Sequence, residues 1–163
     1  MDVVLFIGSV SDLDVVRDAL ELLKAFDVSF TFEITSAHRS PERTMALVRK
    51  YEAEGAEVFI AVAGKAAHLG GFVAAHTVRP VIGVPVESGG LGGLDALLST
   101  VQMPKGIPVA TMGTGKAGAA NAAILAVQIL SLGRPALREK LVESRLKMAA
   151  QVEADAEKAR RMT

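Results

Sequence analysis

Short apolar runs alternate along this chain with longer segments of helical periodicity, and this alternation constrains the fold more than any other feature. Each run of strand length is followed by a segment whose apolar residues recur every three or four positions. Strand–helix–strand repeats form a parallel sheet with right-handed crossovers, which place helices on both faces. We therefore predict a three-layer α/β/α, doubly wound parallel sheet with strands at Val3–Ile7, Val28–Ile34, Glu57–Val62, Pro80–Pro85 and Ile107–Met112.

The same periodicity predicts the helices. They are expected at Val15–Phe26, Pro41–Glu54, Ala66–His76, Leu94–Val101 and Ala117–Leu132, with a charged amphipathic helix from about Pro135. No linker, internal repeat or low-complexity tract divides the chain. We therefore expect one α/β domain over residues 1–163, in which residues 135–163 form a C-terminal extension helix.

The composition restricts the environment and the partners of the protein. The 163 residues are 50% hydrophobic, and 18 Lys and Arg balance 18 Asp and Glu, so no global charge attracts nucleic acid or an anionic membrane. No apolar run reaches the roughly 18–20 residues of a membrane span. The N-terminus lacks a signal-peptide pattern, and there is no cysteine for disulfides. We expect a cytoplasmic protein.

The segment Ser36–Glu42 places a histidine and an arginine side by side after a predicted strand. Ser40 is suited to cap a helix and Pro41 suits the first helical position, so His38 and Arg39 occupy a short strand-to-helix loop. Such loops bind ligands in open α/β sheets. An imidazole exchanges protons near neutral pH, and a guanidinium grips phosphate. The alternative is an exposed pair without a role.

Two further loops with glycine follow predicted strands. In Gly8–Asp12, backbone N–H groups and serine hydroxyls at a helix start can hold a phosphate, although Ser11 or Asp12 can equally serve as a helix cap. In Ala63–Gly71, small residues let the backbone approach a ligand closely. Here His68 either reaches the pocket or is a hydrogen-bonded, partly buried histidine.

Other patterns argue against common cofactor and metal sites. Gly113–Gly118 is similar to a phosphate-binding P-loop, but Ala110 stands in place of its first glycine and Ala117 in place of the Ser or Thr that holds magnesium. His76 is expected at a helix end, and the three histidines of the chain have no zinc-ligand spacing. We expect neither an NTPase site nor a metal site.

Four motifs follow one another along the chain. They are Gly8-Ser9-x-Ser11-Asp12, Ser36-Ala37-His38-Arg39, Ala63-Gly64-x-Ala66-Ala67-His68-Leu69 and Val101-Gln102-Met103-Pro104-x-Gly106-Ile107-Pro108-Val109. In this order and at similar spacing, they resemble one family, the N5-carboxyaminoimidazole ribonucleotide mutases. These small purine-biosynthesis enzymes are also called the catalytic subunit of phosphoribosylaminoimidazole carboxylase. The resemblance covers nearly the whole chain and weakens only toward the C-terminus.

The resemblance implies a flavodoxin-like fold, a homo-octamer, and no metal or organic cofactor. A second branch of the family carboxylates aminoimidazole ribonucleotide directly with carbon dioxide, and it lacks the run Ala66–Leu69, so this run favours the mutase. Two positions depart from the family. Lys65 stands where mutases carry Gly or an apolar residue, and Gly70 stands where they carry Pro. Lys65 either points outward or adds a cation near the site.

The reaction that the resemblance implies belongs to IMP biosynthesis. It moves a carboxylate from the exocyclic amine of an imidazole ribonucleotide to ring carbon C4, which gives 4-carboxy-5-aminoimidazole ribonucleotide. We expect carbon dioxide to be released in a closed pocket and then added to C4, with one group that protonates the amine and later removes the C4 proton. His38 is the expected shuttle. By their match to the family, Arg39 and Ser9 are expected on the phosphate and Asp12 on the ribose.

The full set of expected substrate-binding residues comes from the first three motifs: Gly8, Ser9, Ser11, Asp12, Ser36, Ala37, Arg39, Gly64, Lys65, Ala66, His68 and Leu69. Two other functions stay open, a direct aminoimidazole ribonucleotide carboxylase and a non-catalytic nucleotide-binding module. The helix expected at Ala117–Leu132 agrees with assembly, because a helix that is apolar nearly all round is usually buried on more than one side. The alternative is burial of this helix within its own domain.

Overall fold

The protein, as a computed structural model, is described over residues 1–162 and divides into two compact units, Met1–Val127 and the segment from Gln128 onward. Within the described residues, the first unit holds one sheet of five parallel strands in the order β2-β1-β3-β4-β5. This order is the flavodoxin-like form of the doubly wound sheet, so the predicted fold class is confirmed. The strands are β1 (Val3–Ile7), β2 (Phe30–Ile34), β3 (Val58–Gly64), β4 (Val81–Val86) and β5 (Ala110–Thr111).

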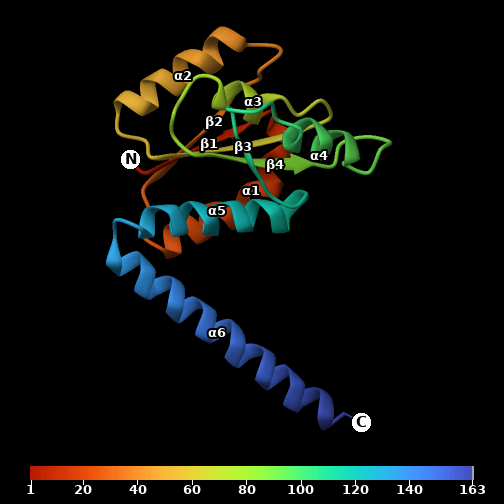
Figure 1. Ribbon diagram of the computed structural model, residues 1–163. Coiled ribbons are helices and arrows are strands. Elements are labelled where there is room, and N and C mark those ends of the chain that lie inside the picture. The colour runs from red at the N-terminus through yellow and green to blue at the C-terminus, as the bar shows by residue number, and fades with distance from the viewer. Residues whose placement is uncertain (163) are drawn as a thin grey trace. The chain divides into compact units, whose positions relative to one another are not determined.

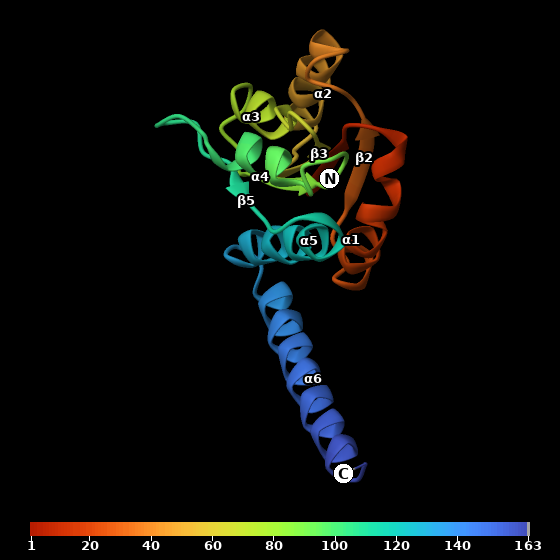
Figure 2. The ribbon, with the colours of Figure 1, turned by 90° about the vertical axis from the view of Figure 1, so that its right-hand side faces the viewer.

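Helices cover both faces of this sheet, as Figures 1 and 2 show. One face carries α2, α3 and α4, and the other carries α1 and the first part of α5. The elements are a short 3₁₀ helix η1 (Val10–Asp12), α1 (Leu13–Ala25), α2 (Pro41–Ala53), α3 (Leu69–Ala74), α4 (Leu94–Val101), α5 (Gly115–Ser131) and α6 (Pro135–Arg160). The helix predicted at Leu94–Val101 has the predicted bounds.

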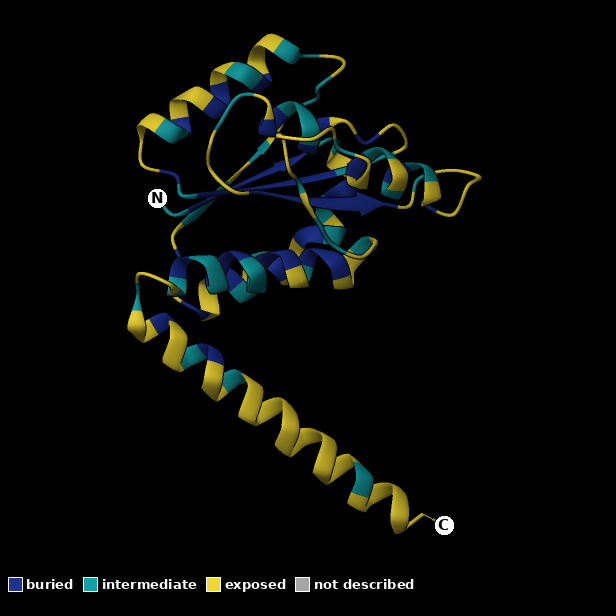
Figure 3. Cartoon of the chain, viewed as in Figure 1, coloured by how far each residue is buried: buried dark blue, intermediate teal, exposed yellow. Residues whose placement is uncertain are grey.

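The central strands are buried on both faces, which Figure 3 shows as continuous dark blue. Successive side chains of a strand point to opposite faces. Val4 and Phe6 of β1 therefore lie on one face with Phe59 of β3, in a cluster that includes Leu47 and Val48 of α2. The rings of Phe6 and Phe59 are stacked with their centroids 5.9 Å apart. This double burial explains why the strands appear in the sequence as unbroken apolar runs.

Three predicted elements were too long by two residues or more. The second strand begins at Phe30 rather than Val28, because the Val28 N–H donates to Leu23 O and closes the turn after α1. The fifth strand contains only Ala110 and Thr111, since Pro108 has no N–H to donate to a ladder. The third helix is shorter than predicted and spans Leu69–Ala74.

The second unit contains the end of α5 and the whole of α6, whose residues beyond Leu146 are almost all exposed (Figure 3). The expectation of a single domain over residues 1–163 stays a prediction. No helix within residues 1–162 combines the length and the apolar character needed to cross a membrane.

We predict that Gly83→Ala destabilises the first unit. A Cβ on Gly83 would overlap Thr100 Cγ2 and lie 2.8 Å from Val109 Cγ1, and Thr100 is buried. Overpacking of this kind costs roughly 1–3 kcal/mol. The midpoint of urea unfolding, measured at a fixed protein concentration, should fall. The matched control is Gly90→Ala, whose new Cβ would meet no atom within 4 Å, and equal midpoints for the two variants would contradict the packing described here.

Candidate active site

A pocket of about 510 Å³ lies in the first unit at the carboxyl ends of β1, β2, β3 and β4. Its volume lies within the usual range of small-molecule sites. Every residue that the sequence predicted for catalysis or substrate binding lines this pocket, although a role in binding or catalysis stays a prediction for each of them. The lining residues are Gly8, Ser9, Ser11, Asp12, Ser36, Ala37, His38, Arg39, Ala63, Gly64, Lys65, Ala66, His68, Leu69 and Ser88.

The topology explains why distant motifs meet here. β1 pairs with β2 on one side and with β3 on the other, so the chain leaves the middle of the sheet in both directions. In open α/β sheets the crevice at such a reversal is the usual ligand site. The loops after β1, β2 and β3 therefore border one crevice, and the loop after β4 reaches it through Ser88.

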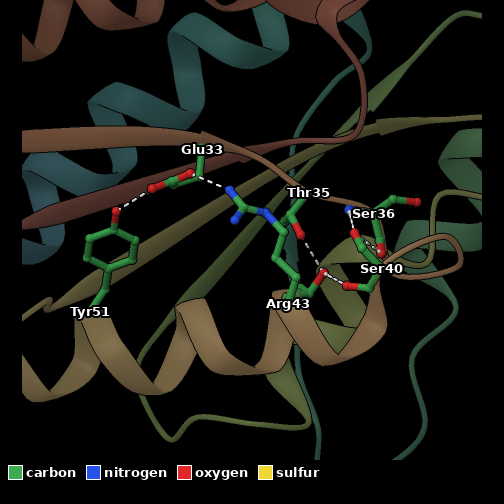
Figure 4. Close-up of polar contacts among 7 residues, drawn as sticks. Glu33, Thr35, Ser36, Ser40, Arg43 and Tyr51 are labelled. Atoms are coloured by element: carbon green, nitrogen blue, oxygen red, sulfur yellow. Dashed lines mark hydrogen bonds and ion pairs between the residues drawn. The ribbon is translucent and has the colours of Figure 1, made fainter.

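The loop that carries His38 is fixed at both ends. Thr35 Oγ1 and Thr44 Oγ1 share a buried hydrogen bond of 2.7 Å, which joins the end of β2 to the first turn of α2 (Figure 4). Ser40 Oγ accepts from the Ser36 N–H at 3.2 Å and donates to Ser36 O at 3.3 Å. The prediction that the Ser40 side chain caps α2 was wrong, because this hydroxyl closes the loop instead. Pro41 begins the helix as predicted.

A second set of contacts holds β2 against α2. The Glu33 carboxylate accepts from Arg43 at 2.9 Å and from the Tyr51 hydroxyl at 2.6 Å (Figure 4). The hydrogen bond to Glu33 is the main cause that raises the pKa of Tyr51 above its ordinary value. This network holds together β2 and α2, the two elements that the loop connects. None of the three residues of the network lines the pocket.

Two histidines from different loops meet at the pocket. His38 Nε2 lies 2.8 Å from His68 Nδ1, and the two rings are nearly perpendicular, with an interplanar angle of 76°. A hydrogen bond between two ring nitrogens needs one donor and one acceptor, so one proton lies between them. Both side chains are exposed. His68 thus reaches the pocket, and of the two alternatives for this residue the partly buried one was wrong.

Arg39 connects the loop after β2 to the loop after β1. Its Nη2 donates to Gly8 O at 3.0 Å, and its Nε lies 3.5 Å from Ser36 Oγ. Ser36 Oγ also accepts from the Arg39 backbone N–H at 3.2 Å. These contacts use the Nε and Nη2 donors of the guanidinium and hold a positive charge at the β1–β2 end of the pocket.

Asp12 is the buried acid of the pocket and is only 7% exposed. Burial raises the pKa of its carboxyl above the ordinary value, while hydrogen bonds with the Ser11 side chain and the Ser9 backbone act in the opposite direction. Ser9 Oγ accepts from the Ser11 N–H at 3.4 Å and so caps η1. Asp12 stands at the start of α1 but makes no capping bond with its side chain. The side-chain cap in this loop is therefore that of Ser9 on η1, and Asp12, at the N-cap position of α1, does not cap that helix with its carboxylate.

Lys65 adopts a left-handed backbone conformation with φ of 56°. This region is costly for residues other than glycine and such strain occurs often at binding sites. Lys65 is exposed, and it brings a second cation to the lining of the pocket. It follows β3, whereas Arg39 follows β2, and β1 lies between these two strands in the sheet.

Ser88, which follows β4 in a glycine-rich loop, was not predicted as a site residue. A Cβ on Gly64 would overlap Ser88 Oγ, so the two residues are in close contact across the ends of β3 and β4. Ser88 could have been predicted from its position just beyond a strand, at the same edge of the sheet as the three motifs that line the pocket.

Other residues singled out from the sequence lie outside this pocket. His76 Nδ1 is 2.7 Å from Phe72 O just after α3, as expected for a histidine at a helix end. Lys116, in the stretch similar to a P-loop, pairs with Asp14 at 2.6 Å and lowers the pKa of that carboxyl. Among residues 1–162, no three His, Cys, Asp or Glu side chains gather in a way that could hold a metal ion.

Comparison with known proteins shows the family of this chain. The sequence model of the family described as AIR carboxylase matches residues 2–151. The chain is 52% identical over 141 residues to N5-carboxyaminoimidazole ribonucleotide mutase of Pyrococcus abyssi, covering 86% of this chain and 80% of that protein. It is 49% identical over 158 residues to the mutase of Methanocaldococcus jannaschii, covering 97% of both.

A solved structure supports the same relationship. The crystal structure of Treponema denticola PurE superimposes with a TM-score of 0.87 at 29% sequence identity, over 96% of each chain. Together with the family match over most of the chain, this confirms the resemblance seen in the four motifs. The chain belongs to the AIR carboxylase family.

Proposed function

We propose that this protein converts N5-carboxyaminoimidazole ribonucleotide to 4-carboxy-5-aminoimidazole ribonucleotide in the cytoplasm. One observation carries the proposal: residues of three separate motifs line a single pocket, in which His38 and His68 are hydrogen-bonded. The relatives named as mutases, at about half identity over most of the chain, support the same substrate.

The experiment is incubation of the purified protein with N5-carboxyaminoimidazole ribonucleotide, without ATP, biotin or added metal and with a chelator present. The ultraviolet change of the imidazole follows the reaction. Conversion to the C4-carboxylated product supports the mutase. If the protein instead consumes aminoimidazole ribonucleotide and bicarbonate, it is a direct carboxylase. Binding of either nucleotide without turnover identifies a non-catalytic module.

The proposed chemistry needs one proton to move in each direction. The bond between the exocyclic nitrogen and its carboxylate breaks, carbon dioxide is released, and the nitrogen accepts a proton. C4 then attacks the carbon dioxide and loses its own proton. A single acid–base group serves both steps, because the proton given to nitrogen is recovered from C4. His38 is that group in our proposal, and its imidazole ends each turnover in the state in which it began.

The hydrogen bond to His68 suits this role. His38 Nε2 and His68 Nδ1 hold one proton between them, which fixes the orientation of the His38 ring and leaves its other nitrogen for a ligand. A shuttle of this kind depends on a ring that keeps its orientation while its proton is transferred.

The substrate-binding roles follow the charges of the pocket. The guanidinium of Arg39 and the hydroxyl of Ser9 lie at the β1–β2 end, where we place the phosphate. Asp12 accepts hydrogen bonds from the ribose hydroxyls. Lys65 supplies a further positive charge for the carboxylated imidazole, beside the small residues Gly64 and Ala66.

Assembly into a homo-octamer is part of the same proposal. α4 exposes Leu94, Leu98 and Val101, which recur at helical spacing on one side. An exposed apolar stripe on a folded domain typically marks a protein interface. His68 and Leu98 line a second cavity of about 430 Å³, and His68 also lines the main pocket, so a neighbouring subunit on this stripe would lie close to the site. By contrast, α5 buries most of its small residues, Ala119, Ala122, Ala123 and Ala126 among them.

We predict that His38→Asn lowers kcat by about 100- to 10,000-fold, the usual contribution of a positioned acid–base group. Substrate affinity should change little, because Asn keeps a polar side chain of similar reach in the same loop. Stopped-flow turnover and equilibrium binding give the two numbers. His76→Asn, outside the pocket, is the control and should keep the wild-type rate. A His38→Asn enzyme with more than half of the wild-type rate would rule out the shuttle.

We predict that Arg39→Ala acts mainly on binding of the phosphate. A hydrogen bond to a charged group is worth roughly 1.5–3 kcal/mol, which corresponds to about 10- to 100-fold in affinity. Calorimetry should show this loss for the ribonucleotide and almost none for its dephosphorylated nucleoside. Arg49→Ala, an exposed change on α2, should affect neither ligand. An equal loss for both ligands would place Arg39 elsewhere than on the phosphate.

We predict a homo-octamer in solution. Light scattering at micromolar concentration should give eight times the chain mass of 17.1 kDa, and the mass and the specific activity should fall together on dilution. A monomer that retains full activity would contradict both the assembly and a site completed by a neighbour.

A further inference from the structure

The Ser88 side chain is the only hydroxyl that the loop after β4 brings to the lining of the pocket within residues 1–162. It is partly exposed, and no residue among 1–162 forms a hydrogen bond with its Oγ. Each of the other three serines of the lining has a hydrogen bond through its side chain: Ser9, Ser11 and Ser36. Ser88 therefore presents an unused donor to whatever fills the pocket.

The absence of a side chain at Gly64 leaves the space that the Ser88 hydroxyl occupies. A Cβ on Gly64 would overlap Ser88 Oγ and lie 3.0 Å from Val86 O. The backbone of Gly64 is not left-handed, so conformation does not demand a glycine at this position. The space that a side chain would take at the end of β3 is instead filled by the Ser88 hydroxyl. The next residue, Gly89, has φ of 117°, a conformation that turns the chain directly after Ser88 and that L side chains rarely adopt.

The strand order tells which part of the ligand Ser88 meets. Arg39 lies above the β1–β2 end of the sheet, whereas Ser88 follows β4, on the far side of β3. In a ribonucleotide the ribose separates the phosphate from the base. With the phosphate on Arg39, the base and its carboxylate extend toward β3 and β4, where Gly64, Lys65 and Ser88 gather.

We propose that the Ser88 hydroxyl donates a hydrogen bond to the migrating carboxylate and holds it, as carboxylate or carbon dioxide, until C4 attacks. Gly64 keeps Ser88 in that place by leaving it room. This inference rests on the proposed function and adds a substrate-contacting residue to it. No atom of Ser88 is transferred: the bond from nitrogen to the carboxylate carbon breaks, the bond from C4 to the same carbon forms, and the proton moves through His38.

The test is the fate of the carbon dioxide. The products of N5-carboxyaminoimidazole ribonucleotide are separated by chromatography, and the ratio of decarboxylated aminoimidazole ribonucleotide to C4-carboxylated product is measured, after subtraction of the reaction without enzyme. Ser88→Ala should raise this ratio about 2- to 10-fold, which is the worth of a hydrogen bond to an uncharged group, because the carbon dioxide that can escape is neutral. A purely structural role would lower the rate and leave the ratio unchanged.

Gly64→Ala provides the second variant, because its Cβ would displace the Ser88 side chain without removing it. It should raise the same ratio, and the double variant Gly64→Ala/Ser88→Ala should be no worse than either single variant, since residues that act as a unit are not additive. Ser131→Ala is the control, because this hydroxyl only donates to Gln128 O on α5. It should keep the wild-type ratio.

The outcomes separate the two claims. Isomerisation by the wild type with an unchanged product ratio in Ser88→Ala would overturn the role of Ser88 and leave the mutase proposal intact. Additive effects of Gly64→Ala and Ser88→Ala would overturn the link between the two residues. A wild type that makes no C4-carboxylated product would overturn the mutase proposal and, with it, the role of Ser88.

Discussion

The parallel register of β1 with both of its neighbours is the constraint on which the site depends. Ile7 pairs with Ile34 on one side and with Val62 on the other, so β1 and β2 end level with each other and β3 extends two residues farther. The ends of these strands and the segments that follow them carry Gly8–Asp12, Ser36–Arg39 and Ala63–Leu69. The site is therefore a consequence of strand pairing, and the apolar residues that drive this pairing are remote from the chemistry.

The pocket combines a rigid frame with exposed functional groups. The buried Thr35–Thr44 hydrogen bond and the closed loop from Ser36 to Ser40 fix the backbone that carries His38. The imidazole itself is exposed, and its Nε2 is hydrogen-bonded to His68 Nδ1 rather than to the frame. A ring held by one shared proton keeps its orientation and still exchanges the proton at its other nitrogen, which is the property that the proposed shuttle requires.

Much of this arrangement could be predicted from the sequence, because it follows from local patterns. Unbroken apolar runs predicted strands buried on both faces, and Pro41 predicted the start of α2. The contacts that depend on three dimensions were missed. Ser40 bonds back to Ser36 instead of capping the helix, since its hydroxyl finds both a donor and an acceptor within the loop.

The remaining misses have the same origin. Val28 reads as strand by composition, yet its N–H closes the turn after α1. The contact of Ser88 with Gly64 joins two loops that are adjacent only because β4 pairs with β3. The spacing of residues along the chain does not predict such a contact. The rule that ligands bind at the carboxyl ends of parallel strands, however, predicts a site residue in the loop after β4.

Transfer of the carboxylate without exchange with carbon dioxide in solution is measured most directly by isotope retention. N5-carboxyaminoimidazole ribonucleotide labelled with ¹³C in its carboxylate is converted in the presence of excess unlabelled bicarbonate, and the product is analysed by mass spectrometry. If the carbon dioxide stays in the pocket until C4 attacks it, 4-carboxy-5-aminoimidazole ribonucleotide keeps nearly all of the label. A product with the isotope ratio of the bicarbonate would show that carbon dioxide comes from solution, and it would rule out transfer within the pocket.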